Sequence, residues 1–286
     1  MAEVEKVALV TGCSSGIGKA TAWALAEAGY RVYATSRKLV DMEQVVQEAE
    51  ESKLSMHART LDVTKQDSID AVIAEIERAE GRLDVLVNNA GYALIGSVED
   101  LPMEDVRKQY DVNVFGLLAV FKAGVPLMRQ SGGGTIVNIS SVAGRVSAPL
   151  MGVYCSTKFA VEALSLAMSG EVHQFGIRVV AVEPGPVNTR FVETAMKASG
   201  HVVSRNDSPY SNGYAKLRGF YGDPYGYPPE RVAKVILRVV RAKRPKTRYT
   251  VRGRERLYAA AGTLVATKVG QRFIRGYFDL KPEKTR

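Results

Sequence analysis

Short apolar runs alternate along the chain with longer segments that have a helical pattern. Seven runs rich in β-branched residues predict strands, and most are continuously apolar at their centres, as expected of strands covered on both faces. They span Lys6–Thr11, Tyr30–Ser36, Ser55–Leu61, Leu83–Asn88, Gly134–Ser140, Arg178–Glu183 and Arg248–Val251. Because helical segments separate them, this order predicts a doubly wound α/β fold with a parallel seven-stranded sheet.

Two segments interrupt this alternation. Residues 184–229 form a long connection rich in Gly, Pro, Asn, Ser and Tyr, which is typical of a lid or binding loop. The chain shows no repeat of about 20–50 residues and no Pro- or Ser-rich linker, so we expect a single domain. Residues 1–228 would form its body, with 186–228 as a loop over the site. Residues 229–286 would form a helical C-terminal extension of the same domain.

The basic charge is concentrated in that extension. The whole sequence has 39 Lys and Arg against 30 Asp and Glu, a net charge of +9, so an anionic partner such as nucleic acid or a membrane has to be considered. The extension holds 17 basic residues and only four acidic ones, a net of +13. The remaining 228 residues therefore carry −4. A polyanion would have to bind through the extension.

Several compositional features bear on the compartment. Cys13 and Cys155 lie in no spacing typical of a zinc site or a disulfide framework, which favours a reducing environment. The acidic N-terminus lacks the basic region of a signal peptide. The longest uncharged stretch of the extension, Leu257–Thr267, has 11 residues, whereas a membrane-spanning helix needs about 20. We therefore expect a cytoplasmic protein. Three histidines share no ligand spacing, and we expect no metal site: His57, His173 and His201.

A glycine-rich turn directly follows the first predicted strand. It reads Thr11-Gly12-Cys13-Ser14-Ser15-Gly16-Ile17-Gly18, and a helical segment follows it. Glycine has no Cβ, so the backbone can approach a pyrophosphate, and the helix N-terminus supplies free N–H groups and a positive dipole end. Because strand, turn and helix occur in the required order, the pattern favours a phosphate-binding turn over a plain tight connection.

With its spacing Thr-Gly-x-x-x-Gly-x-Gly, this turn resembles that of the short-chain dehydrogenase/reductase superfamily. Further motifs follow in the order of that family, over residues 11–189. They are Asn88-Asn89-Ala90-Gly91, Asn113, Ser141, Tyr154-Cys155-Ser156-Thr157-Lys158 and Pro184-Gly185-Pro186-Val187-Asn188-Thr189. The resemblance implies a Rossmann-like fold and an oxidoreductase with a nicotinamide cofactor.

The residues after the second strand indicate which cofactor is used. A carboxylate there would accept from the ribose hydroxyls of NAD, whereas an arginine pairs with the 2′-phosphate of NADP. The chain has no carboxylate at this strand end and continues with Arg37 and Lys38. Arg37 can hold the phosphate with two N–H groups, and Ser15 can add a hydroxyl. We therefore predict NADP(H); the alternative is that Arg37 and Lys38 only begin the next helix in solvent.

The spacing of Tyr154 and Lys158 points to proton transfer. Reduction of a carbonyl by a hydride needs a proton donor, but a free tyrosine with a pKa of about 10 is a poor base at neutral pH. At positions i and i+4 the two side chains share a helix face, and the ammonium favours the phenolate. The resemblance implies that Tyr154 is the acid/base, Ser141 binds the substrate oxygen, and Asn113 holds a water that connects Lys158 to solvent.

The resemblance also assigns contacts along the whole cofactor. Asp62 would meet the adenine, although this residue could equally form a turn at a strand end. The backbone of Val187 and the hydroxyl of Thr189 would meet the nicotinamide carboxamide, and Lys158 the nicotinamide ribose. The expected cofactor-binding residues are Gly12, Ser14, Ser15, Gly16, Ile17, Gly18, Arg37, Asp62, Asn88, Asn89, Gly91, Tyr154, Lys158, Pro184, Gly185, Val187 and Thr189.

The residues expected around the catalytic tyrosine are apolar. They include Leu94, Ile95, Val146, Met151 and Phe191, and such a lining suits a hydrophobic alcohol or ketone, although plain packing would give the same composition. The chain resembles most the hydroxysteroid and retinol dehydrogenase branch of the family. The expected reaction is the interconversion of a hydrophobic secondary alcohol and its ketone, and another ketone such as a 3-oxoacyl thioester is the alternative.

Three interpretations of the basic extension stay open. It can be a solvated rim around a helix that packs over the substrate cleft, which the sequence favours slightly. It can be an interfacial helix that contacts a membrane peripherally, with its basic residues facing anionic headgroups. It can bind nucleic acid, but only its charge supports this and no recognition motif is present, so we expect no nucleic-acid partner. The family resemblance further implies a homo-oligomer, a dimer or a tetramer. The apolar residues that would insert into a membrane are Leu257, Leu264, Val265, Phe273, Ile274 and Phe278.

Overall fold

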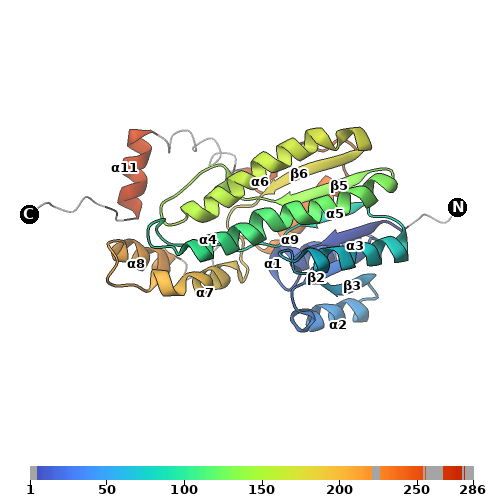
Figure 1. Ribbon diagram of the computed structural model, residues 1–286, viewed down its shortest axis with the longest axis horizontal. Coiled ribbons are helices and arrows are strands. Elements are labelled where there is room, and N and C mark those ends of the chain that lie inside the picture. Colours follow the sequence, from blue (N-terminus) through green and yellow to red (C-terminus); the bar gives the residue numbers. More distant parts are fainter. Residues whose placement is uncertain (1–4, 221–225, 254, 256–266, 279, 281–286) are drawn as a thin grey trace, which may run out of the picture.

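Seven parallel strands form one sheet in the order β3-β2-β1-β4-β5-β6-β7 (Figure 1). The structure is a computed structural model that describes residues 5–220, 226–253, 255, 267–278 and 280. The doubly wound fold is confirmed, and every strand lies within two residues of its predicted bounds. The strands are β1 (Val7–Val10), β2 (Arg31–Ser36), β3 (Met56–Thr60), β4 (Val85–Asn88), β5 (Gly134–Ile139), β6 (Ile177–Glu183) and β7 (Arg248–Thr250).

Helices cover both faces of the sheet, which explains why the strands are apolar at successive positions. On one face Ala8 and Val10 pack with α1 (Gly16–Glu27), α2 (Glu43–Glu51) and α9 (Pro229–Arg241). On the other face Val7 and Leu9 pack with three further helices. These are α3 (Gln66–Glu80), α5 (Leu117–Gln130) and α6 (Gly152–Glu171). Short helical turns complete the connections: η1 (Leu39–Met42), η2 (Asp111–Gly116), η3 (Val142–Gly144) and η4 (His173–Phe175).

The chain reverses its direction of winding between β1 and β4. Strand β1 pairs with β2 on one side and with β4 on the other, and the chain returns to β4 only after β3. In open α/β sheets the crevice at the carboxyl ends of such strands is the usual ligand site. The glycine-rich turn and the Asn88–Gly91 motif both lie at this point.

The segment predicted as a loop is largely helical, which corrects that prediction. It contains α7 (Phe191–Val203) and α8 (Ser211–Phe220), and the turn-forming residues that suggested a loop lie between and beside these helices. A third apolar cluster explains the difference, because Ala195 and Val202 on α7 and Tyr214 on α8 are buried there against the segment 93–101. The two helices form a packed cap beside the carboxyl edge of the sheet.

The long helical run before β5 is a core element. It joins α4 (Met103–Tyr110), the π-helical turn η2 and α5, and over Met103–Gln130 it is long and apolar enough to span a membrane by length and composition. More than half of its most apolar window is buried inside the protein, and α5 packs against the sheet and α3. These contacts are those of a buried helix in a doubly wound fold.

The described part of the C-terminal extension belongs to the same domain. Helix α9 buries Val232, Ile236 and Val239 in the core, and β7 extends the sheet beside β6. Helix α11 (Lys268–Tyr277) lies near α8 in Figure 1, and Phe278 just after it packs against the third apolar cluster. Of the residues expected to insert into a membrane, Leu257, Leu264 and Val265 lie outside the described residues, as do the side chains of Phe273 and Ile274.

Candidate active site

The glycine-rich turn lines a cavity. Gly12 and Gly16 have φ angles of +74° and +60°, in the left-handed region that favours glycine. A Cβ on Gly18 would lie 2.1 Å from the carbonyl oxygen of Gly12, so only glycine lets the turn close this tightly. No described side chain caps α1 at Ser15, and its first turn holds no acidic residue. The helix therefore presents its N-terminal amides to an anion.

The ends of β1 and β4 are locked together beneath this turn. The side-chain amide of Asn89 donates to the carbonyl oxygens of Thr11 and Gly12, at 2.8 and 3.0 Å. The Thr11 hydroxyl accepts from the backbone N–H groups of Asn89 and Ala90, each at 3.0 Å. These contacts hold the phosphate-binding turn and the Asn-Asn-Ala-Gly motif in one rigid unit.

Residues that follow β2 and β3 line the cavity beside the glycine-rich turn, since the backbone N–H of Cys13 donates to the carbonyl oxygen of Thr35 at 2.7 Å. Arg37 lines the cavity with an exposed side chain, as an arginine that meets a 2′-phosphate must. Asp62 lines the same part of the cavity. Burial acts to raise the pKa of its carboxyl, but the hydroxyl and backbone N–H of Thr64 donate to it and hold the pKa below its usual range. Asp62 thus both forms a turn and faces the cavity.

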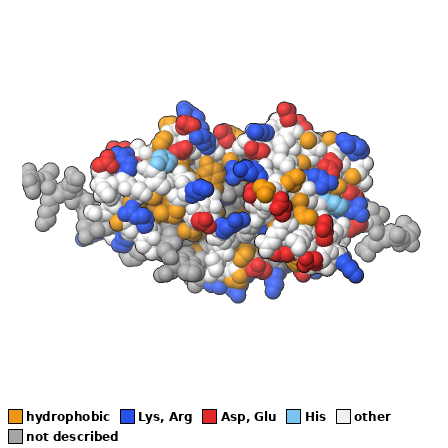
Figure 2. Space-filling model, turned by 90° about the horizontal axis from the view of Figure 1, so that it is seen from below, with side chains coloured by type: hydrophobic (Ala, Val, Ile, Leu, Met, Phe, Trp, Pro, Cys, Tyr) orange, Lys and Arg blue, Asp and Glu red, His pale blue; other side chains and the backbone are white. Residues whose placement is uncertain are grey.

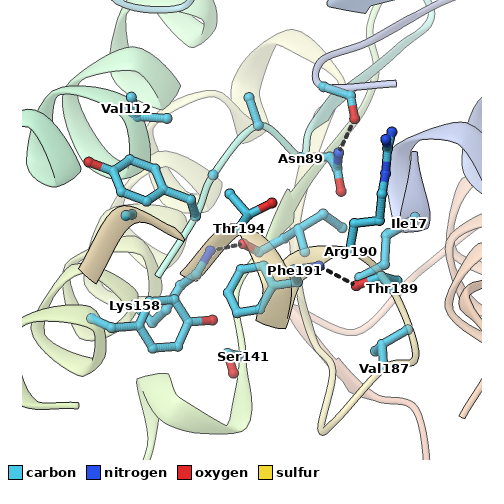
Figure 3. Close-up of a pocket in the computed structure, with 18 of the residues that line it drawn as sticks. Ile17, Asn89, Val112, Ser141, Lys158, Val187, Thr189, Arg190, Phe191 and Thr194 are labelled. Carbon is cyan, nitrogen blue, oxygen red and sulfur yellow. Dashed lines mark hydrogen bonds between the residues drawn. The ribbon is translucent and has the colours of Figure 1, made fainter. Parts of the chain in front are cut away.

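Tyr154, Lys158 and Ser141 line the same cavity. Tyr154 and Lys158 project from the same face of α6, with the Lys158 Nζ 6.0 Å from the centre of the Tyr154 ring. Ser141 precedes η3, where its Oγ accepts from the backbone N–H of Ala143 at 3.1 Å. Figure 3 shows Lys158 and Ser141 facing the same space as Phe191, whose ring centre lies 5.7 Å from that of Tyr154. The spacing on the helix and the strand-end position of Ser141 produce this convergence.

Burial changes the pKa of Lys158. The Lys158 side chain is 7% exposed, and its Nζ donates to the carbonyl oxygen of Ile139 at 2.8 Å. Burial lowers the pKa of Lys158 to about 8, while the carboxylate of Glu162, one helical turn further, acts in the opposite direction. Lys158 is thus an ammonium at neutral pH that can release its proton within reach of physiological pH. The same Glu162, together with burial, raises the pKa of Glu183 to about 6.

Asn113 lies behind the cavity wall and shapes it. The residue sits in the π-helical turn η2, and its side chain is buried. Its Oδ1 accepts from the backbone N–H of Tyr92 at 3.0 Å, and its Nδ2 donates to the carbonyl oxygen of Tyr92 and to the hydroxyl of Thr157. The side chain thereby joins the segment after β4 to α6, the helix that carries Tyr154.

The segment after β6 forms the wall opposite α6. The carbonyl oxygen of Pro184 accepts from the backbone N–H of Val142 at 3.0 Å and from the hydroxyl of Ser141 at 3.4 Å. The Thr189 hydroxyl accepts from the backbone N–H of Phe191 at 3.2 Å, a contact drawn in Figure 3. Val187 and Thr189 therefore face the cavity from a turn that is tied to Ser141.

The cavity has a volume of about 980 Å³ and gathers most of the predicted residues. Of the expected catalytic and cofactor-binding residues, Gly18, Asn88 and Asn113 do not line it, and of the expected apolar lining Ile95 is buried instead in the third apolar cluster. Asn88 points instead to Asn138 on the neighbouring strand, with 2.9 Å between Nδ2 and Oδ1. The predicted residues that do line it are Gly12, Ser14, Ser15, Gly16, Ile17, Arg37, Asp62, Asn89, Gly91, Ser141, Tyr154, Lys158, Pro184, Gly185, Val187 and Thr189.

Sequence reasoning missed Arg190. This residue lines the cavity, and its guanidinium donates to the carbonyl oxygen of Ser14 at 3.1 Å, so it connects the wall after β6 to the glycine-rich turn. Figure 3 shows the side chain extending beside Ile17. The signal was present in the sequence, because an arginine directly follows Thr189 in the motif. Tyr92 and Thr194 also line the cavity and were not singled out.

The residues present fit a dinucleotide. A crevice at the reversal point of the sheet, helix N-terminal amides facing an anion site, and a cavity that runs from Arg37 to Tyr154 are the features that such a ligand requires.

Comparison with known proteins agrees with this geometry. A family model described as short chain dehydrogenase matches residues 6–199. The chain is 35% identical over 248 residues to the 3-ketodihydrosphingosine reductase of Bacteroides thetaiotaomicron, covering 86% of this chain and 87% of that protein. It is 34% identical to the NADPH-dependent 3-dehydrocapnine reductase of Ornithobacterium rhinotracheale, covering 96% and 98%. Human 17-beta-hydroxysteroid dehydrogenase type 1 is 34% identical, with 85% and 76% covered.

Solved structures show the same architecture. A short-chain dehydrogenase from Streptomyces avermitilis superposes with a TM-score of 0.79 at 29% identity, covering 99% of this chain and all of that one. An alcohol dehydrogenase from Thermococcus sibiricus, complexed with 5-hydroxy-NADP, gives a TM-score of 0.70 at 26% identity, covering 86% and 95%. The chain belongs to the short-chain dehydrogenase/reductase family. It is an oxidoreductase that acts on CH–OH and C=O groups.

Proposed function

We propose that the protein interconverts a hydrophobic secondary alcohol and its ketone, with NADP(H) as the cofactor. The observation that carries this proposal is that Tyr154, Lys158 and Ser141 line one cavity with the phosphate-binding turn. Arg37 beside that turn, a relative named for its NADPH dependence and a similar structure that holds an NADP derivative support NADP(H) over NAD(H).

The residues of the chain divide the chemistry among them. When bound, NADP(H) supplies or accepts the hydride. In the reductive direction the Tyr154 hydroxyl donates a proton to the carbonyl oxygen of the substrate as negative charge develops there. The Ser141 hydroxyl donates a hydrogen bond to the same oxygen. The Lys158 ammonium, held by the carbonyl oxygen of Ile139, stabilises the tyrosinate that remains.

The lining next to Tyr154 supports a hydrophobic substrate. Leu94, Val146 and Met151 line the cavity, and α7 and α8 adjoin it with the third apolar cluster. Two of the similar proteins are named as reductases, of 3-ketodihydrosphingosine and of 3-dehydrocapnine, and one is named as a hydroxysteroid dehydrogenase. Within the same chemistry, a long-chain 3-ketone is therefore a second candidate beside a steroid- or retinoid-like ketone, and a 3-oxoacyl thioester is a third.

A substrate panel tests the proposal. The full chain would be assayed by loss of NADPH absorbance with steroid, retinoid, long-chain 3-oxo and 3-oxoacyl thioester substrates. We expect turnover with at least one of these hydrophobic carbonyls. We also expect Tyr154→Phe to lower kcat by about 100-fold or more, because the proton donor is lost, while NADPH still binds. Turnover that Tyr154→Phe retains would remove Tyr154 from the mechanism.

Exposed aromatic side chains support a homo-oligomer. Phe115 in η2 and Phe159 on α6 are 56% and 44% exposed, and Leu166 follows two turns further along α6 at 54%. Tyr110, just before η2, is hydrogen-bonded to Ser156 of α6, so the two exposed faces adjoin. Large apolar side chains gathered in this way favour a second copy of the chain as the partner.

For the extension we propose a structural place in a cytoplasmic enzyme. Phe278 packs against the third apolar cluster, and Leu280 lies near Gly213 of α8, which supports a helix that packs beside the substrate cap. On the face seen in Figure 2, basic and acidic side chains are interspersed. Salt-sensitive binding of the full chain to anionic vesicles, absent with neutral vesicles, would contradict this proposal and favour peripheral membrane contact.

A further inference from the structure

Glu255 lies in the described part of the basic extension, and its carboxylate is buried. Its side chain is 1% exposed in a segment where basic residues outnumber acidic ones 17 to 4. The Oε2 atom accepts from the backbone N–H groups of Val251 and Arg252, at 2.7 and 2.8 Å. These two bonds fix the carboxylate just beyond the end of β7 and leave Oε1 pointing towards the segment after β6.

The second oxygen reaches the cofactor wall. Glu255 Oε1 accepts from the backbone N–H of Gly185 at 3.1 Å and from the Tyr227 hydroxyl at 2.9 Å. The contact requires a glycine, because a Cβ on Gly185 would lie 2.6 Å from this oxygen. Gly185 itself lines the cavity, two residues before Val187. Glu255 therefore supports, from behind, the turn that faces the nicotinamide end.

Tyr227 connects Glu255 to the backbone around Val187. Its backbone N–H donates to the carbonyl oxygen of Pro186 at 3.2 Å, and its carbonyl oxygen accepts from the backbone N–H of Asn188 at 2.8 Å, so it pairs with Val187 like a short strand. The ring is 1% exposed and lies 4.8 Å from the Arg252 guanidinium. Burial and the hydrogen bond to Glu255 raise the pKa of Tyr227, so its hydroxyl stays a donor at physiological pH.

We infer that Glu255 is a positioning residue for the nicotinamide half of the cofactor. Its carboxylate holds Gly185 and, through Tyr227, the backbone on both sides of Val187, and so sets the position from which Val187 and Thr189 meet the carboxamide. The inference rests on the proposed contacts of Val187 and Thr189. It also gives the basic extension a part in the cofactor site. The adenine and phosphate half is built from other elements, the glycine-rich turn and the ends of β2 and β3, and does not depend on Glu255.

Because different elements support the two halves of the proposed cofactor site, ligand binding at each half can be tested separately. The full-length chain and its Glu255→Ala variant would each be titrated with NADPH and with 2′-phospho-ADP-ribose, which lacks the nicotinamide. We expect Glu255→Ala to weaken NADPH binding about tenfold or more, equivalent to about 1.4 kcal/mol, and to change binding of 2′-phospho-ADP-ribose less than about twofold. Glu230→Ala, which removes an exposed carboxylate from the same basic extension, is the matched control and should change neither value.

A purely structural role gives a different result. Equal weakening of both ligands, or unchanged binding of NADPH, would overturn the inference while leaving the proposed function intact. A parent chain that fails to bind NADPH would overturn both. Tyr227→Phe is a second variant should Glu255→Ala fail to fold. It removes the hydroxyl that accepts from the Gly185 N–H at 2.9 Å and leaves the Glu255 carboxylate to accept from the same N–H, so we expect selective weakening of NADPH by about threefold. Equal binding of NADPH by Tyr227→Phe and the parent would count against the inference in the same way.

Discussion

The acid/base chemistry at the residue scale depends on the burial of Lys158. An exposed ammonium at this position would be solvated and would act on Tyr154 only weakly, whereas a buried ammonium acts through a medium of low dielectric constant. The carbonyl oxygen of Ile139 and the carboxylate of Glu162 compensate part of the cost of burying the charge. The protein therefore gives up stability at Lys158 to keep a positive charge beside the tyrosine.

Burying the Lys158 ammonium should lower the stability of the folded chain in a pH-dependent way. The folded chain releases the Lys158 proton near pH 8, whereas the unfolded chain keeps it up to about pH 10.5. Folding is therefore opposed below pH 8, by about 3 kcal/mol, and the penalty fades as the pH rises from 8 to 10.5. After subtraction of the lost hydrogen bond to Ile139, Lys158→Met should raise the free energy of unfolding by about 2 kcal/mol at pH 7 while abolishing turnover.

Urea unfolding of the apoprotein at pH 7 and pH 9.5 measures this effect. The stability gained by Lys158→Met should shrink by about 2 kcal/mol at the higher pH, because the folded parent no longer carries the charge. An equal gain in stability at pH 7 and pH 9.5 would show that burial does not lower the pKa of Lys158. Lys53→Met, on the exposed turn before β3, is the control and should show neither effect.

Two arginines at the cavity should affect the cofactor differently. Arg37 lies where only NADP has a phosphate, so Arg37→Ala should weaken NADPH binding about tenfold to 100-fold and leave NADH binding unchanged. Arg190 lies against the glycine-rich turn, where both cofactors carry the pyrophosphate, so Arg190→Ala should weaken both to the same extent.

Direct titration of the apoprotein with both cofactors tests these assignments. Arg78→Ala, an exposed arginine on α3 away from the cavity, is the control. A parent that prefers NADH would contradict the role of Arg37. An Arg190→Ala variant that loses only NADPH binding would place Arg190 at the 2′-phosphate instead of the pyrophosphate.

At the scale of elements, α6 and the α7–α8 cap contribute in different ways. Helix α6 carries Tyr154, Lys158 and Glu162 at intervals of four residues, so one helix face presents the acid/base, the cation and its counter-charge. This arrangement follows from the helical repeat alone. The cap depends instead on a buried carboxylate, since the Asp100 Oδ2 accepts from the hydroxyls of Tyr214 and Ser208, each at 2.5 Å.

Loss of this anchor should loosen the cap without affecting the cofactor half of the cavity. Burial acts to raise the pKa of Asp100, but the Ser208 and Tyr214 hydroxyls hold it below its usual range, so the side chain is a carboxylate at neutral pH. Asp100→Ala should lower the free energy of unfolding by about 2–4 kcal/mol, because two buried hydroxyls lose their acceptor. It should also raise the KM for the carbonyl substrate more than it weakens NADPH binding.

Thermal unfolding and steady-state kinetics measure the two effects. Asp207→Ala, whose exposed carboxylate shares Arg205 with Asp100, is the matched control and should change stability by less than about 0.5 kcal/mol. An unchanged KM together with the loss of stability would make the Asp100 cluster a purely structural feature of the cap.

At the scale of the whole molecule, the exposed aromatic face on η2 and α6 predicts the assembly. Light scattering after gel filtration should give the parent a mass that is a multiple of 31.1 kDa. The double variant Phe115→Glu with Phe159→Glu should shift this mass towards 31.1 kDa, because charges cannot be buried unpaired at an interface. Val40→Glu, at an equally exposed apolar side chain far from this face, should leave the assembly intact. A monomeric parent would contradict the proposal.

The place of the C-terminal extension in the domain also belongs to the scale of the whole molecule. In the sequence the net charge divides into −4 for residues 1–228 and +13 for residues 229–286, and all recognisable chemistry lies in the first part. In the structure α9 is a core helix, β7 is a strand of the sheet, and Glu255 accepts a hydrogen bond from Gly185 in the cavity wall. The described part of the extension is therefore built into the domain.

The strands could be predicted to within two residues because each is a short apolar run between turn signals, a pattern that depends only on local sequence. The cap could not, because its helices lie in a segment rich in Gly, Pro, Asn and Ser, whose composition is that of a loop. What stabilises α7 and α8 is packing of Ala195, Val202 and Tyr214 against a segment about 100 residues earlier. Glu255 was missed for a related reason. A polar residue outside a known motif shows its role only through the groups it meets in space.

The sequence by itself determined the order of the strands along the chain, the position of the glycine-rich turn and the pairing of Tyr154 with Lys158. All three depend on periodicities and motifs within a few residues of one another. Only the tertiary structure decided that Lys158 is buried, that Arg190 reaches Ser14 and that Glu255 holds Gly185. Burial and contact between residues 70 to 176 positions apart depend on how the whole chain packs, and no local pattern encodes them.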